Sequence, residues 1–300
     1  MKSILLCLLT LLAVADAGAQ RCEIISMDHF GGNLGELLVP PYFKQNSNGS
    51  VGVTFSSSST SGSVRTDCPM PVVQGFAGVC RWYDPTFTTL LGQDCGGIAA
   101  NFIDATFYIY PQPNGDTIFI GQGEVSNSQE LAIERRNGAA VAWNKIYGGG
   151  SSELLRQVVD LGAEGFLVTM EAYSSDGDVG LHYGGWNLPD IWILRLDTDG
   201  NILWKRVLGG SGSDIPCAAQ AAADGGFYIF AGTYSSDHDI VDSKGAPDLF
   251  VAKLDSAGNK EWTKCYGGTG NDGSAFDMAI HAIADGSGGF YILSRTDSQD

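Results

Sequence analysis

Residues 199–210 read DGNILWKRVLGG, and close copies of this stretch occur at 137–149 (NGAAVAWNKIYGG) and at 257–268 (AGNKEWTKCYGG). Each copy runs from a Gly-containing turn through a Trp-bearing segment to a Gly-Gly pair. Self-similarity of this kind is the sequence signature of a repeat architecture. The chain is therefore predicted to be built from copies of one structural unit.

The repeat extends upstream of these three copies. Windows of 21 residues at 77–97, 190–210 and 248–268 all end in Gly-Gly and carry Asp at the eighth position, as Asp84, Asp197 and Asp255. A shorter match joins ISMDHFGG (25–32) to AWNKIYGG (142–149). The Gly-Gly pairs at 31–32, 96–97, 148–149, 209–210 and 267–268 are 65, 52, 61 and 58 residues apart.

One period contains four candidate strands. Within 211–268 they are CAAQAAA (217–223), FYIFAGTY (227–234), DLFVAKLD (248–255) and KEWTKCYG (260–267), separated by turn-forming residues. The second of them is rich in aromatic and β-branched residues, which favour strands. Turn signals at this spacing indicate a meander of short antiparallel strands.

Two segments conflict with local residue preference. CAAQAAA (217–223) and ELLRQVVDL (153–161) contain mostly good helix formers. Both nevertheless occupy the repeat position that the strand-like segment DATFYIY (104–110) fills. The register of the repeat therefore predicts strands, and small side chains suit a crowded innermost strand near an axis.

A four-stranded antiparallel unit of about 60 residues cannot bury both of its faces alone, whereas stacked and radially closed copies can. We therefore predict an all-β fold, a β-propeller of four-stranded antiparallel blades that is incomplete at the C-terminus. The incompleteness is inferred because the sequence enters at a fourth strand and leaves after a second one. The expected parts are a fourth strand at 23–30, blades at 33–97, 98–149, 150–210 and 211–268, and a partial blade at 269–300.

This architecture gives the repeated residues structural roles. The Trp of each fourth strand is expected to pack between neighbouring blades, and the Gly-Gly pair is expected to end that strand. The residues concerned are Trp143, Trp204, Trp262, Gly148, Gly149, Gly209, Gly210, Gly267 and Gly268.

The charge balance restricts the class of partner. The chain has 34 acidic and 17 basic residues, a formal net charge of −17. Nucleic-acid binding needs a basic face, so a nucleic-acid partner is excluded. Because 44% of the residues are hydrophobic and 17% charged, bulk disorder is excluded as well.

The N-terminus is typical of a secretory signal peptide. Lys2 precedes an apolar core from Ile4 to Val14, and small residues at 17–19 form a cleavage site before Gln20. The apolar core is too short for a membrane span. We expect residues 1–19 to be removed and 20–300 to be secreted or displayed on the cell surface, with no membrane span.

Six cysteines follow the predicted signal peptide, and an even number in an exported chain suggests disulfides. Cys68 with Cys80 is the first choice among the 15 connectivities. Cys217 and Cys265 are expected either to pair or to remain as buried free thiols. The sequence has no Cys-x-x-Cys motif and no Cys/His cluster, which argues against a zinc site.

The repeats resemble those of secreted bacterial β-propeller repeat proteins, whose units follow the patterns W-x-K-x-[YF]-G-G, D-G-G-[FY], S-x-D-G-D-V and D-x-W-[IV]-x-[KR]-L-D-x-x-G-N. The match is carried by WNKIYGG, WKRVLGG, WTKCYGG, DGGFY, SSDGDV, DIWILRLDTDGN and DLFVAKLDSAGN. It covers about 25–300 and is specific from about 140 onward; in the earlier part Leu91 replaces the Trp. The resemblance implies export by the type IX route.

Asp-rich loops recur between the second and third strands, as SSDGDV (174–179), SSDHDI (235–240) and TDSQD (296–300). Asp176 with Asp178, and Asp237 with Asp239, offer alternating carboxylates of the kind that Ca²⁺ binds, although no distal Glu follows. The alternative is a polar turn in which Asp and Ser side chains bind the local backbone. Ca²⁺ is the only cofactor that the sequence suggests.

Catalytic motifs are not found. The sequence contains neither GxSxG nor HExxH, and its four histidines are isolated from one another. DTDGNILW (197–204) resembles the Asp-box of sialidase propellers, which is a structural turn, but the arginine cluster of such enzymes has no counterpart. We therefore assign no catalytic or cofactor-binding residue and favour a non-enzymatic protein.

The expected function is that of a binding or scaffold module with a protein or glycan ligand. Tyr183 and Trp186, in HYGGWNLPD (182–190), could stack on a glycan, although covering a blade edge is the role we favour for them. The alternative function is the propeller part of an exported glycan-active hydrolase, because fold alone does not fix function.

Overall fold

The computed structural model describes residues 11–12, 23–24, 36–45, 51–57, 77–83, 90–96, 105–112, 114–138, 140–245, 247–272, 281–284, 289–294 and 296–299. The chain forms two compact units, Met1–Gly123 with Ala132–Asn144, and Glu124–Leu131 with Lys145–Asp300. Within the described ranges, no helix combines the length and apolarity needed to cross a membrane.

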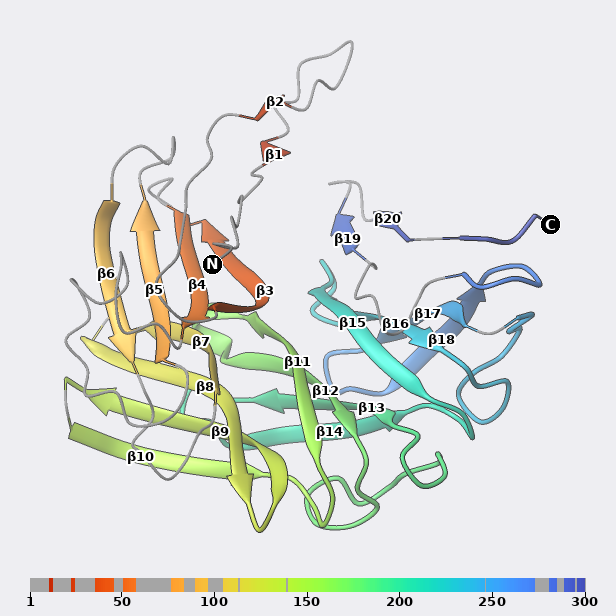
Figure 1. Cartoon of the computed structure of the whole chain (residues 1–300), viewed down its shortest axis with the longest axis horizontal. Helices are drawn as coiled ribbons and strands as arrows, with labels where there is room; N and C mark the ends of the chain where they lie inside the picture. The colour runs from red at the N-terminus through yellow and green to blue at the C-terminus, as the bar shows by residue number, and fades with distance from the viewer. Residues whose placement is uncertain are drawn as a thin grey trace, which may run out of the picture. The chain divides into compact units, whose positions relative to one another are not determined.

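The described chain is all-β, and its strands pair antiparallel, as predicted (Figure 1). Besides strands, these ranges contain one 3-10 helix, Gly162–Glu164. Strands that follow one another in the sequence are neighbours in each sheet, so the chain runs as a series of meanders. Successive four-stranded meanders of this kind are propeller-like.

The first four-stranded sheet consists of β3 (Glu36–Gln45), β4 (Val51–Ser57), β5 (Ala77–Tyr83) and β6 (Leu90–Gly96). The second consists of β7 (Ala105–Pro111), β8 (Asp116–Val125), β9 (Ser128–Asn137) and β10 (Ala140–Tyr147).

The third sheet consists of β11 (Glu153–Asp160), β12 (Phe166–Ala172), β13 (Asp190–Leu196) and β14 (Ile202–Leu208). The fourth consists of β15 (Asp214–Ala221), β16 (Phe227–Thr233), β17 (Asp248–Leu254) and β18 (Lys260–Tyr266). Strands β19 (His281–Ala284) and β20 (Phe290–Leu293) pair with each other.

The two segments of helix-forming composition are strands, as the repeat register predicts. They form β11 and β15, each the first strand of its sheet. Both strands shift register after their third residue, between Leu155 and Gln157 and between Pro216 and Ala218. Pairing with the next strand and burial thus override the local preference for helix.

The first strands also carry a link that repeats from sheet to sheet. The Gln157 side chain of β11 accepts a hydrogen bond from the backbone N–H of Ala219 in β15 (2.5 Å). One period later, the Gln220 side chain of β15 donates to the carbonyl of Ala282 in β19. The first strands β11 and β15 are therefore each linked to the following first strand through a glutamine.

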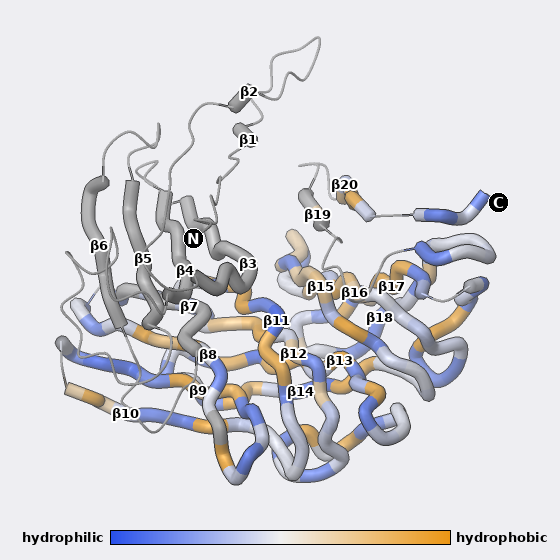
Figure 2. Tube along the Cα trace, viewed as in Figure 1, coloured by the Kyte–Doolittle hydropathy of each residue, from blue (hydrophilic) through white to orange (hydrophobic). Residues whose placement is uncertain are grey.

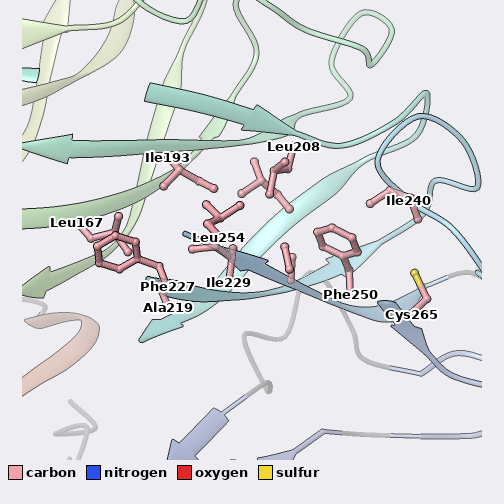
Figure 3. Packing of buried hydrophobic residues seen from close by; sticks show 13 residues of the cluster. Leu167, Ile193, Leu208, Ala219, Phe227, Ile229, Ile240, Phe250, Leu254 and Cys265 are labelled. Atoms are coloured by element: carbon pink, nitrogen blue, oxygen red, sulfur yellow. The ribbon is translucent and has the colours of Figure 1, made fainter. Parts of the chain in front are cut away.

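The core of the second unit lies between the third and fourth sheets. Ile193 and Leu208 of the third sheet pack with Phe227, Ile229 and Phe250 of the fourth (Figure 3). Every residue of β12, β13 and β17 is buried, and Figure 2 shows apolar stretches along strands and polar stretches in many connecting loops. Full burial of one such large apolar side chain contributes about 1.5–3 kcal/mol, so face-to-face packing is the main stabilising contact here.

Several predictions concern residues that are only partly described. Within the predicted fourth strand 23–30, the structure describes β2 (Glu23–Ile24), which pairs with β1 (Leu11–Leu12); residues 25–30 lie outside the described ranges. The same holds for Cys68 and for the side chain of Cys80. Cys217 and Cys265 are free thiols, the second of the two alternatives expected for them; Cys265 is buried, whereas Cys217 is only half-buried.

Candidate functional site: carboxyl pairs at the Gly-Gly turns

Each described Gly-Gly turn is closed by an acidic residue four positions after its second glycine. The N–H of Gly149 donates to Glu153 Oε2 (2.9 Å), and the N–H of Gly210 donates to Asp214 Oδ2 (2.7 Å). A third such bond joins the N–H of Gly268 to Asp272 Oδ2. The three acids are buried, so the backbone N–H of the turn donates a hydrogen bond to a carboxyl group that is shielded from water.

A second acidic residue lies on the other side of the first glycine of each turn. A Cβ atom on Gly209 would lie 2.2 Å from Asp190 Oδ1 and 2.9 Å from Asp214 Oδ2, so only glycine fits between them. Asp190 belongs to the third strand of one sheet and Asp214 to the first strand of the next. We call the repeated arrangements the first, second and third carboxyl pairs: Glu130–Glu153 at Gly148, Asp190–Asp214 at Gly209, and Asp248–Asp272 at Gly267.

The two acids of the second pair have different hydrogen-bond surroundings. Asp214 accepts hydrogen bonds from the hydroxyls of Thr233 and Ser235, the latter at 2.8 Å. Asp190 Oδ2 accepts from the N–H groups of Tyr183 (2.5 Å) and Gly184 (3.3 Å). Asp190 Oδ1 is buried without a hydrogen-bond partner, and this is the atom that faces Gly209.

Burial governs the ionisation of the second pair. The pKa of Asp190 is raised to about 7, chiefly by burial; the N–H donors of Tyr183 and Gly184 oppose this shift, and the charges of Asp214 and Asp239 add to it. Burial likewise raises the pKa of Asp214 to about 6, despite its three donors. Removing a carboxylate from water disfavours its charged form, which is the sign observed.

The first and third pairs differ from each other in the direction in which their pKa values shift. Burial raises the pKa of Glu130, and its hydrogen bond with Glu153 raises it further. Burial also raises the pKa of Glu153 itself. At Asp272 burial acts in the same direction, but the donors Ser298 and Thr296 outweigh it, and the pKa of Asp272 lies below its ordinary value.

The carboxyl pairs do not form a hydrolytic site. A glycosidase also uses two carboxyl groups, and they flank the scissile bond of a bound sugar. Asp190 and Asp214 are fully buried, so no substrate can reach them. Their shared role is to join neighbouring sheets.

The four proposed calcium ligands lie at the same turns. Asp176 accepts from the N–H of Gly150 (2.6 Å), and Asp237 accepts from the N–H of Ser211 (2.7 Å). Asp178 and Asp239 accept longer hydrogen bonds, both 3.3 Å, from the N–H groups of the first glycines of the same turns, Gly148 and Gly209. Each carboxylate thus binds backbone that lies 26 or 30 residues earlier in the sequence. Among the described residues, no group of three or more His, Cys, Asp or Glu is placed to hold a metal ion.

The Asp at position eight of the repeat organises the turn between the third and fourth strands. Asp197 Oδ1 accepts from the N–H groups of Asp199 (2.9 Å) and Asn201 (2.8 Å), and Asp255 binds its own turn in the same way. A cation from the preceding fourth strand holds the outside of each turn. Lys145 Nζ donates to the Asp199 carbonyl (2.6 Å), and one period later Arg206 Nε donates to the Gly258 carbonyl (2.8 Å).

The three tryptophans at the equivalent repeat position are not equally buried. Trp204 packs against the core cluster, and its Nε1–H donates to the carbonyl of Ser256 in the next sheet (3.0 Å). Trp143 is half-buried on β10. Trp262 is 43% exposed, and its ring contacts Tyr228 of its own sheet.

The loop between β12 and β13 exposes one aromatic ring completely. Trp186 is 96% exposed, so the favoured interpretation, that it covers a blade edge, is wrong for this residue. Tyr183 instead stacks on His238, with ring centroids 4.5 Å apart. His182 Nε2 is 2.9 Å from the Leu188 carbonyl, which ties the two arms of the loop together on either side of Trp186.

A groove lies beside this loop. Its volume is about 420 Å³, and it is lined by Leu181 and Tyr183 of the loop, by Lys205 and Arg206 of β14, and by Lys260 of β18, among others. Lys260 pairs with Asp239. Lys205 Nζ donates to the carbonyl of Asp178, and Arg206 donates to carbonyl and amide oxygens. The groove is therefore more basic than the chain as a whole.

The sequence predictions did not include the carboxyl pairs. A signal for half of each pair is present, because Glu153, Asp214 and Asp272 all stand four residues after a Gly-Gly pair. The other half, on the preceding third strand, needs the stacking of two sheets to be known. Trp186 carries no repeat signal, because the corresponding loop of the fourth sheet, 234–247, contains no Trp.

The comparisons with known proteins identify structural similarity only. No family model matches the chain, and no curated protein matches it. Among solved structures, the chain is similar to an endo-arabinase from Bacteroides thetaiotaomicron, with a TM-score of 0.43, 11% identity, and coverage of 87% of this chain and 90% of that one. It is also similar to cobalt-substituted Synechocystis ACO (TM-score 0.44, 10% identity, 85% of this chain and 55% of that one) and to an ACO/RPE65 chimera (TM-score 0.38, 10% identity, 82% and 52%).

Proposed function

We propose that the chain is a non-catalytic binding module of a secreted or cell-surface repeat propeller. The four-stranded sheets would be its blades, closed into a ring, with the predicted signal peptide removed. Two features support a structural framework of this kind: the carboxyl pairs and the Asp turns, which bind backbone and join neighbouring sheets. Function would then belong to the loops that the framework carries.

The observation that carries the proposal is Trp186. A tryptophan that is 96% exposed leaves a large apolar ring in water, and such rings are enriched where proteins bind partners. The loop around it is held in place by the bonds of Tyr183 and Gly184 to Asp190. A loop whose backbone is already held in this way loses little conformational entropy on binding, which favours recognition.

The groove beside the loop gives the ligand its chemical class. A volume of about 420 Å³ lies in the range of small-molecule sites. Lys205 and Arg206 bring positive charge, and Leu181 and Tyr183 bring apolar surface. We infer a glycan ligand that carries carboxylate or sulfate groups, with its sugar faces against the aromatic rings.

A glycan array of neutral and acidic saccharides tests the proposal. Wild type is expected to retain acidic glycans without releasing reducing sugar. Trp186→Ala is expected to lose at least tenfold in affinity while its melting curve stays unchanged, since surface substitutions alter stability by about 0.5 kcal/mol or less. Tyr291→Ala, at another exposed aromatic residue, is the matched control and keeps wild-type binding.

Two results would contradict this function. An array on which no glycan is retained, or a Trp186→Ala variant that binds as wild type does, refutes recognition through the loop. Release of reducing sugar by wild type would favour the alternative, a glycan-active hydrolase.

A further inference from the structure

The carboxyl pairs share an unusual feature at the same atom. In each pair the acid of the third strand has one buried oxygen without a hydrogen-bond partner: Glu130 Oε2, Asp190 Oδ1 and Asp248 Oδ1. In each pair this oxygen is also the atom that approaches the glycine between the two acids. Leaving a buried carboxylate oxygen without a donor costs several kcal/mol. In the first and second pairs, this recurrence at one repeat position indicates that a common partner is required there.

A proton meets this requirement. If the third-strand acid is protonated at that oxygen, the oxygen becomes a donor directed at the acid across the glycine. In the second pair, Asp190 Oδ1 and Asp214 Oδ2 lie 2.2 and 2.9 Å from the same point, the Cβ position of Gly209. In the first pair Glu130 Oε2 and Glu153 Oε2 likewise both approach the Cβ position of Gly148. Two like charges at this separation in a buried site cannot both be retained without a large penalty.

We propose that the first and second carboxyl pairs each hold a proton near neutral pH, on Glu130 Oε2 and Asp190 Oδ1, and that loss of this proton weakens the packing between neighbouring sheets as the pH rises. The proposal goes beyond ligand binding and does not depend on it. It makes the second unit a pH-sensitive assembly of sheets, more stable in mildly acidic than in mildly alkaline solution.

The direction of the pH dependence follows from linkage. The pKa of Asp190 is raised by burial to about 7, from an ordinary value of 3.8. Between these values the folded chain binds more protons than the unfolded chain. The stability contributed by the proton is fully present below pH 3.8 and is lost as the pH rises through about 7. Asp214 acts in the same direction, because burial raises its pKa to about 6.

The proposal is confined to the first two pairs. In the third, the pKa of Asp272 lies below its ordinary value, because the hydroxyl donors of Ser298 and Thr296 outweigh burial.

Other charged groups lie near these acids, and their contributions to the pH dependence of stability must be distinguished from that of the proposed proton. His182 Nε2 is 3.9 Å from Asp190 Oδ2. Asp239 adds negative charge near Asp190, Asp237 does so near Asp214, and Asp178 does so near Glu130. The charge of Lys260 reaches Tyr183, whose ring stacks on His238. Because His182 lies this close to Asp190, its contribution needs its own control.

Urea unfolding between pH 5 and 8.5 tests the proposal on the full chain. Asp190→Asn places an amide N–H where the proton would be, and Glu130→Gln does the same in the first pair. The unfolding equilibrium constant of wild type is expected to rise about tenfold per pH unit for each proton lost. In each variant the pH dependence of the unfolding equilibrium constant is expected to fall by about one proton. Each variant is also expected to be at least as stable as wild type at pH 8. The control His182→Gln keeps the slope contributed by Asp190.

A direct titration completes the test. The ¹³C resonance of the Asp190 carboxyl carbon, assigned by comparison with Asp190→Asn, is expected to titrate with a midpoint near 7. A midpoint near 4 overturns the proposal, and so does an Asp190→Asn variant that unfolds with the wild-type pH slope. The resonance is measured on wild type and therefore decides the question even if neither variant folds.

Discussion

The substitution Gly209→Ala tests how closely the two acids of the second carboxyl pair pack against Gly209. The new methyl group would stand 2.2 Å from Asp190 Oδ1 and 2.9 Å from Asp214 Oδ2, well inside ordinary contact distance. Both acids begin buried strands, so neither can move without shifting a sheet. Overpacking of this kind costs about 1–3 kcal/mol, and we expect the upper end because two carboxyl groups must separate. The reason for glycine here is space, since a positive φ is not involved.

Urea unfolding followed by tryptophan fluorescence provides the measurement, at a pH where the second pair holds its proton. Gly185→Ala is the matched control, because its methyl would meet only Leu188 Cδ1 at 3.6 Å, and we expect a change within about 0.5 kcal/mol. Asp190→Ala makes room for the methyl, so Gly209→Ala should cost at least about 1 kcal/mol less in that background. The reasoning fails if Gly209→Ala is as stable as the control variant, or if its cost is the same with and without Asp190.

Two further outcomes follow from the contacts of the fourth strands and the Asp loops. Trp204→Ala should lower the free energy of unfolding by about 3–5 kcal/mol, and the more exposed Trp262→Ala by about 1–2 kcal/mol; equal costs in urea unfolding would contradict the inter-sheet role of Trp204. Chelation with EDTA should leave the melting temperature unchanged, because Asp176 and Asp237 bind backbone N–H groups; a lower melting temperature would show that a cation stabilises these loops.

The repeat register was a better guide to the fold than residue preference. Residues 153–161 and 217–223 contain good helix formers, yet they form β11 and β15. Their position in the period predicts this outcome, because a repeated unit must place equivalent segments in equivalent strands. Ala219 shows why the composition is tolerated: it is buried in the inter-sheet core, and Gln157 of the neighbouring sheet accepts its N–H.

The site could be predicted only in part, for a physical reason. Local hydrogen bonding of Asp in turns follows from side-chain chemistry, and Asp197 and Asp255 fulfil it. A carboxyl pair joins residues of two different sheets, as Asp190 and Asp214 do, so it depends on how the sheets stack. Periodicity does not specify that stacking closely enough. The exposure of Trp186 depends in the same way on a loop outside the repeat pattern.

Variation around the pairs indicates how burial and hydrogen-bond donors together set the charge of a buried acid. In the strand register Glu153 stands opposite Ala172, Asp214 opposite Thr233, and Asp272 bridges to Thr296. Both threonine hydroxyls donate to the acid opposite, whereas Ala172 has no group to donate. A donor favours the ionised form and burial favours the neutral one: burial prevails at Asp214, raising its pKa, and the donors prevail at Asp272, lowering its pKa. The first pair lacks the threonine and has a raised pKa at both acids, with burial as the main cause. The side chain opposite the acid therefore does not set the balance between proton and charge alone, because Asp214 and Asp272 both accept a hydrogen bond from a threonine. Asp214 is fully buried, whereas Asp272 is 6% exposed, so copies of one fold unit differ in ionisation through the balance of burial and donors.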